Sequence, residues 1–70
     1  MQIVNGKLYR HINSGGLYRV ICDDAVLEAT LDRAVVYQAL SDSIVWVRAY
    51  DIFTDGRFEL VLEDTVPTTQ

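Results

Sequence analysis

Five short runs of β-forming residues, most of them bounded by turn signals, constrain the fold of this 70-residue chain more than any other feature. The runs cover residues 7–12, 17–22, 34–40, 44–48 and 57–62. The turn-forming sequences NSGG (13–16), SDS (41–43) and DG (55–56) separate several of them. Short strands between Gly-, Ser- and Asp-rich turns predict an all-β domain.

The small size of the chain favours a closed arrangement of these strands. An open five-stranded sheet would leave two edges and one apolar face uncovered. Residues 49–53 (AYDIF) break the strand alternation and predict one 3₁₀ turn before the last strand. We therefore predict a small five-stranded antiparallel SH3-like barrel over residues 1–64, followed by a flexible tail over residues 65–70.

The segment 23–33 (DDAVLEATLDR) has two interpretations. The favoured one is a long loop, with at most one helical turn, that joins two strands. The other is a helix capped by Asp24, because Ala, Leu and Glu tolerate a helix well. Such a helix over residues 24–33 would pack against an open antiparallel sheet instead of a barrel.

Composition excludes several kinds of site. The single cysteine, Cys22, forms no internal disulfide, and with His11 it supplies only two of the four ligands of a structural zinc site. The acidic residues of 23–32 lack the spacing of a calcium loop. Cys22 alternates with Tyr18 and Val20 and is therefore predicted to be a small core residue. We expect no metal, no cofactor and no catalytic Cys–His pair.

The balance of charge and hydrophobicity limits the partners. Six basic and ten acidic residues give a net charge of −4, which argues against general nucleic-acid binding. No apolar run reaches the roughly 18 residues that span a membrane. The first residues lack the pattern of a secretory signal and the cysteine is single, so a cytoplasmic location is expected. Exposed apolar residues such as Val26 and Leu27 are compatible with formation of a homodimer.

A series of short segments carries a family resemblance. In order they are LYRH (8–11), GLYRV (16–20), TLD (30–32), VVYQAL (35–40), WVR (46–48), Phe53 and RF (57–58). Over residues 6–61 this series resembles the small bacterial domain-of-unknown-function family 1653. The resemblance implies a compact, mainly β, SH3-like domain and no established biochemical function.

The sequence departs from the family pattern at three places. An apolar stretch, AVLEA (25–29), stands where the family usually has a sequence like Ala-Arg-His-Ser-Glu. Ala49 replaces the usual Pro after WVR, and the connection from Phe53 to Phe58 is shorter than usual. These departures imply the family scaffold with a different loop surface.

One set of aromatic and basic residues is a candidate binding surface: Trp46, Arg48, Tyr37, Tyr9 and His11. Trp, Tyr and Arg dominate binding hot spots because they combine large contact area with directed hydrogen bonds. The alternative is that Trp46 and Tyr37 fill the core and that Arg48 covers them. The single histidine, His11, fits a structural or surface role better than that of a general base.

These observations predict a non-enzymatic binding or interaction module for a protein or small ligand. The alternative is a small acidic phage or mobile-element protein that inhibits a host factor. Small size, the net charge of −4 and the acidic segment 23–32 motivate that alternative.

Overall fold

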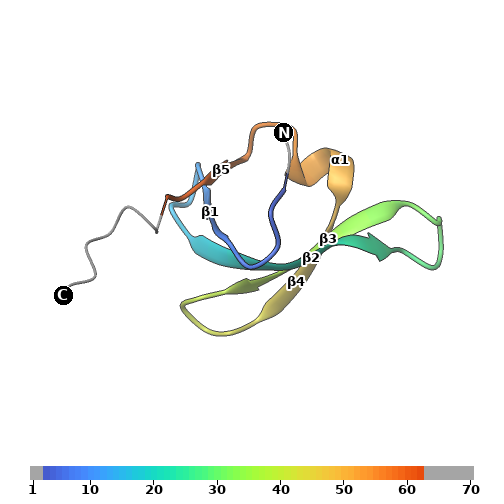
Figure 1. Cartoon of the computed structure of the whole chain (residues 1–70), viewed down its shortest axis with the longest axis horizontal. Helices are drawn as coiled ribbons and strands as arrows, with labels where there is room; N and C mark the ends of the chain where they lie inside the picture. Colours follow the sequence, from blue (N-terminus) through green and yellow to red (C-terminus); the bar gives the residue numbers. More distant parts are fainter. Residues whose placement is uncertain (1–2, 63–70) are drawn as a thin grey trace.

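A computed structural model describes residues 3–62, which form five strands and one helical turn. The elements are β1 (Leu8–His11), β2 (Leu17–Val26), β3 (Arg33–Ala39), β4 (Val45–Ala49), α1 (Tyr50–Phe53) and β5 (Phe58–Leu60). All neighbouring strands are antiparallel, in the order β4-β3-β2-β1-β5 (Figure 1). The predicted all-β, five-stranded, SH3-like barrel fold is confirmed.

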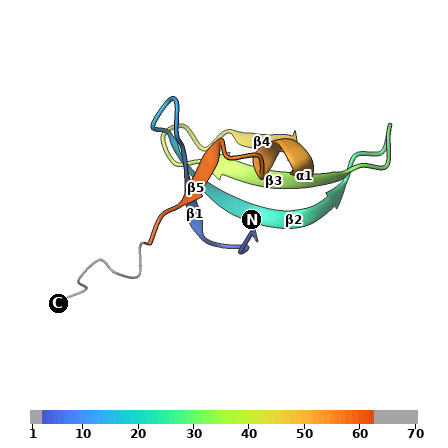
Figure 2. The same cartoon turned by 90° about the horizontal axis from the view of Figure 1, so that it is seen from above.

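The sheet curls because the last strand returns to the first. Strands β1 to β4 follow one another as hairpins, and β5 then pairs with β1 through Tyr9–Leu60 and His11–Phe58. In the view from above, α1 and β5 lie over the part of the sheet formed by β3 (Figure 2). The rings of Phe53 and Phe58 both contact Tyr37 of β3. This closure brings β5 and the inner face of β3 together.

The segment 23–33 is not a helix, and the predicted loop between two strands is present but shorter than expected. Strand β2 continues to Val26 and β3 begins at Arg33, which leaves a short hairpin turn. Two register shifts, between Val20 and Cys22 and between Cys22 and Ala25, interrupt the pairing. Bulges of this kind insert extra residues and hide the two-residue alternation that identifies a strand. The end of this hairpin extends away from the sheet (Figure 1).

The first bulge also overturns the prediction for Cys22. Val20 pairs with Tyr37, whereas Cys22 pairs with Val36, the next residue along β3. Neighbouring residues of a strand point to opposite faces. Cys22 therefore lies on the outer face, half-buried, and is not part of the core beside Val20.

The predicted 3₁₀ turn at residues 49–53 is in the right place but has α-helical geometry. The N–H of Thr54 donates to the carbonyl of Tyr50 at 3.0 Å, four residues back. This single turn, α1, buries Phe53 and leaves Asp51 and Ile52 exposed.

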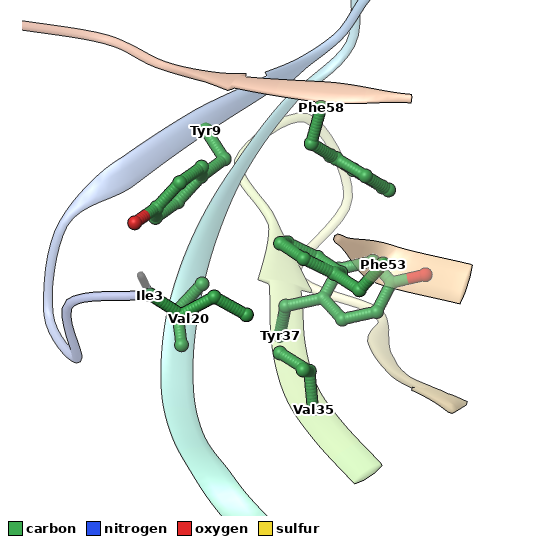
Figure 3. Close-up of a cluster of buried hydrophobic side chains, with 7 residues drawn as sticks. All are labelled: Ile3, Tyr9, Val20, Val35, Tyr37, Phe53 and Phe58. Atoms are coloured by element: carbon green, nitrogen blue, oxygen red, sulfur yellow. The ribbon is translucent and has the colours of Figure 1, made fainter. Parts of the chain in front are cut away.

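The core is one-sided and mostly aromatic (Figure 3). Phe53 and Phe58 are stacked with ring centroids 4.1 Å apart, and Tyr37 meets both rings edge-on. The remaining core side chains are Ile3, Tyr9, Val20 and Val35. Aromatic pairs contribute about 0.5–1.5 kcal/mol beyond the burial of their area. The stack of Phe53 on Phe58 therefore joins α1 to β5, and Tyr37 joins both rings to β3.

Part of the predicted domain division concerns residues that the structure does not describe. The tail predicted for residues 65–70 and the boundary at residue 64 lie outside the described residues. Within residues 3–62, no helix is long and apolar enough to cross a membrane.

Candidate functional site

A hollow of about 190 Å³ opens on the inner face of the sheet, between β4 and β5. All five strands contribute to its lining, and Ser14 of the β1–β2 turn completes it. The lining residues are His11, Ser14, Tyr18, Tyr37, Trp46, Arg48 and Phe58. Pockets that enclose drug-sized ligands measure roughly 300–1,000 Å³. The hollow is therefore large enough for one side chain or a small group, but not for an enclosed cofactor.

Strand pairing places Trp46 in the wall of this hollow. Trp46 lies opposite Tyr37 in the β3–β4 ladder, so both side chains are on the inner face. Tyr37 is only 3% exposed and belongs to the core, whereas Trp46 is 48% exposed. The sequence left open whether these two aromatics are core or surface residues. In the structure one of them is core and the other is half-exposed at the edge strand.

Arg48 lies across the same hollow. Its Nε–H donates a hydrogen bond to the Tyr37 hydroxyl at 3.1 Å, and its Cζ is 5.6 Å from the centroid of the Phe58 ring. Within residues 3–62, Arg10, Arg33 and Arg57 each form an ion pair with a carboxylate, but Arg48 forms none. Its terminal N–H groups can therefore donate to an acceptor placed in the hollow.

His11 lines the hollow near the β1–β2 turn. Its ring meets Phe58 edge-on at 5.0 Å, across the β1–β5 pair that the two residues form. The backbone N–H of Ser14 donates to Nδ1 at 3.3 Å, and the Ser14 hydroxyl lies 3.1 Å from the same atom. With Nδ1 as an acceptor, the neutral ring carries its proton on Nε2. These contacts fix the orientation of the ring.

Tyr9 does not belong to this site. It is fully buried, its ring meets Phe53 edge-on, and its hydroxyl accepts a hydrogen bond from the Val4 N–H at 3.0 Å. Of the five residues predicted for a binding surface, the structure brings together His11, Tyr37, Trp46 and Arg48. It separates Tyr9 from them.

Sequence reasoning missed two aromatic residues of the hollow. Tyr18 alternates with Val20 on β2, and that alternation was enough to place it on the inner face. Phe58 comes close to His11 only because β5 pairs with β1. No local pattern identifies such a pairing between distant segments.

Other chemistry-bearing residues lie apart from the hollow. Cys22 is on the outer face of the sheet, whereas His11 is on the inner face. The acidic segment is partly neutralised, because Arg33 donates to the carboxylate of Asp23 at 2.9 Å. In the described part of the chain, no group of three His, Cys, Asp or Glu side chains could hold a metal ion.

A curled five-stranded sheet with one helical turn before its last strand defines this protein as a small all-β, SH3-like domain. More particularly, the chain belongs to the family described as protein of unknown function (DUF1653), whose model matches residues 7–62. This confirms the resemblance found in the sequence. No curated protein and no solved structure matched the chain.

Proposed function

We propose that this protein is a non-enzymatic interaction module that binds a protein or small ligand through the hollow between β4 and β5. The observation that carries this proposal is the placement of a half-exposed Trp46 beside Arg48, which has no carboxylate partner within residues 3–62. A large exposed aromatic ring beside an arginine is typical of binding hot spots.

The size and lining of the hollow suggest the chemistry of the ligand. About 190 Å³ accommodates one apolar or aromatic side chain between the rings of Trp46, Tyr18 and Phe58. The terminal N–H groups of Arg48 would donate to a carbonyl or carboxylate oxygen next to that side chain. An apolar side chain with an acceptor beside it is what an extended peptide presents. A peptide segment of a partner protein is therefore the ligand that fits best.

The proposal of a binding module rather than an enzyme rests on the geometry of the two nucleophilic candidates. A cysteine nucleophile needs a base within hydrogen-bond reach. Cys22 and His11 lie on opposite faces of the sheet, and Nδ1 of His11 interacts with Ser14. Among the described residues 3–62, these two do not form the pair that nucleophilic catalysis by Cys22 would require.

The proposal can be tested with peptides selected from a random display library for binding to the wild-type protein. We expect Trp46→Ala to weaken the selected peptide by about 30-fold or more, the loss typical of a hot-spot residue. The matched control is Val47→Ala, which truncates the next residue of β4 on the outer face. Circular dichroism must show that both variants are folded.

Two results would contradict the proposal. One is a Trp46→Ala protein that is folded and binds the selected peptides as tightly as the wild type. The other is binding that falls steeply with added salt, because a hollow lined with aromatics predicts only modest salt dependence. Steep dependence would instead favour the acidic-inhibitor alternative, since Asp24, Glu28 and Asp32 are exposed.

A further inference from the structure

Strand β4 lies at one end of the sheet, and its outer edge is open. The N–H of Ala39 donates to the carbonyl of Ile44 at 2.9 Å, so the backbone groups of residue 44 point toward β3. Because this direction alternates along an antiparallel strand, the backbone groups of Val45, Val47 and Ala49 point away from β3. No strand within residues 3–62 pairs with this side of β4.

This edge lacks the devices that usually prevent edge-to-edge association. Edge strands are commonly short, bulged, or protected by Lys or Pro. β4 (VWVRA) has no Lys or Pro, and its pairing with β3 has no register shift. The opposite edge strand, β5, has only three residues and presents Glu59, which pairs with Arg10. One edge of the sheet is thus protected and the other is not.

We propose that the open edge of β4 pairs with the same edge of a second copy of this chain, antiparallel and with a two-fold axis at Val47. In this register Val47 lies opposite the partner's Val47, and Val45 lies opposite the partner's Ala49. These are the residues whose backbone groups point outward, so each such pair exchanges two hydrogen bonds. On the inner face, Trp46 lies opposite the partner's Arg48.

The side chains of β4 favour this register over its neighbours. An axis at Trp46 leaves Ala49 without a partner in the ladder and therefore loses backbone hydrogen bonds. An axis at Arg48 places two guanidinium groups directly opposite each other, which is destabilising. An axis at Val47 instead sets each Trp46 ring against an arginine, the preferred cation for such contacts. It also joins the half-exposed Val45 and Val47 of both copies into one apolar row on the outer face.

The charge of the chain does not oppose this pairing at the edge itself. The net charge is −4, but β4 contains no carboxylate. The pairing would place the two hollows next to each other across the axis, and each would gain an arginine from the other copy at its Trp46 wall. It does not depend on the proposed peptide ligand, although it uses two side chains of the hollow, Trp46 and Arg48, beside the backbone edge and the outer face of β4.

Sedimentation of lysine variants at several concentrations tests the pairing. We expect the wild type to be dimeric and Val47→Lys, which places two ammonium groups face to face, to raise the dimer dissociation constant at least tenfold. The matched control is Val45→Lys, which changes an equally exposed residue of the same face and places its lysine opposite Ala49. We expect a smaller rise for this variant. A wild type that stays monomeric up to about 1 mM would overturn the proposal.

Disulfide trapping tests the register with Cys22 replaced by Ser. Residues in a hydrogen-bonded antiparallel pair have Cα atoms about 5.5 Å apart, within the range of a disulfide. In that background, Val47→Cys should form a linked dimer on mild oxidation, and Val45→Cys should not. Equal linking of both variants, or no linking of Val47→Cys, would overturn the register. Neither measurement involves a ligand, so its failure would leave the proposed function standing.

Discussion

The aromatic core and the β2–β3 arm, residues 23–33, are stabilised in different ways. In the core, rings from β1, β3, α1 and β5 pack together, and Phe53 is fully buried. In the arm, the apolar side chains of Val26 and Leu31 are 62% and 77% exposed. The arm is held by hairpin hydrogen bonds and by the contacts of Arg33 at its base. We therefore expect most of the stability to reside in the core, and substitutions in the arm to cost less than substitutions in the core.

The largest effect is expected in the core. Phe53→Ala removes a ring that contacts Tyr9, Tyr37 and Phe58, and should lower the free energy of unfolding by about 3–5 kcal/mol. Urea denaturation followed by circular dichroism measures this change. The control is Ile52→Ala, which truncates the exposed neighbour in α1. If Phe53→Ala does not fold, Phe53→Leu retains much of the volume and should show a partial loss.

A smaller effect is expected where the arm meets the sheet. Arg33 donates to the backbone carbonyl and the carboxylate of Asp23, and its Cζ lies 3.8 Å from the centroid of the Tyr50 ring. Arg33→Met keeps the aliphatic stem but removes these contacts, for a loss of about 1 kcal/mol. Local opening of the arm should then accelerate hydrogen exchange at the Leu27 amide by about fivefold.

The same exchange measurement includes a control. Arg10→Met removes an ion pair between β1 and β5 whose arginine is as exposed as Arg33, and should leave the Leu27 amide unchanged. Equal acceleration by both variants would show that the arm and the core open as one unit, which would remove the distinction between them.

In the turn of the arm, one substitution is expected to raise the free energy of unfolding instead of lowering it. Leu31 has φ of 63°, a left-handed conformation that a Cβ makes unfavourable, and its N–H closes the turn onto the Leu27 carbonyl. Leu31→Gly relieves this strain and should raise the free energy of unfolding by up to about 1 kcal/mol. Ala29→Gly, in the same turn but without positive φ, should lower it. Changes of the same sign in the free energy of unfolding of both variants would contradict the presence of backbone strain at Leu31.

The smallest effect is expected at the turn before β5. The Arg57 guanidinium donates to the Asp55 carboxylate and holds the pKa of Asp55 below its ordinary value of 3.8. A carboxyl group whose pKa is lowered in the folded state stabilises the fold at pH values above its ordinary pKa. That contribution disappears as the pH falls through the lowered pKa. Asp55→Asn should therefore reduce the melting temperature slightly near neutral pH and not at strongly acidic pH.

The sequence predicted those parts of the molecule that depend on local chemistry. Turn signals and alternation located all five strands, because the turns after β1 and β3 and before β5 contain Gly, Ser or Asp residues that allow the chain to reverse. The arm was missed because its two bulges disturb the alternation between Val20 and Ala25. A leucine in the left-handed turn position also gives no sequence signal, since glycine or asparagine is usual there.

The candidate site, like the fold, was predictable from the sequence only in part. Residue type alone selected Trp46, Arg48, Tyr37 and His11, which the fold brings to one hollow. Residue type could not separate Tyr9 from them, because burial depends on how α1 and β5 cover the sheet. Phe58 was missed because its place in the site depends on the pairing of the first and last strands.

That pairing also has a kinetic consequence. β1 and β5 are far apart in the chain, and contacts between distant segments form slowly because a long loop must close before they gain stability. The β1–β2, β2–β3 and β3–β4 hairpins need only short loops, so we expect them to form earlier. Phe58 reaches His11 only when β5 docks on β1. We therefore expect the hollow to be assembled in the last step of folding, so that ligand capture would report on the completely folded chain.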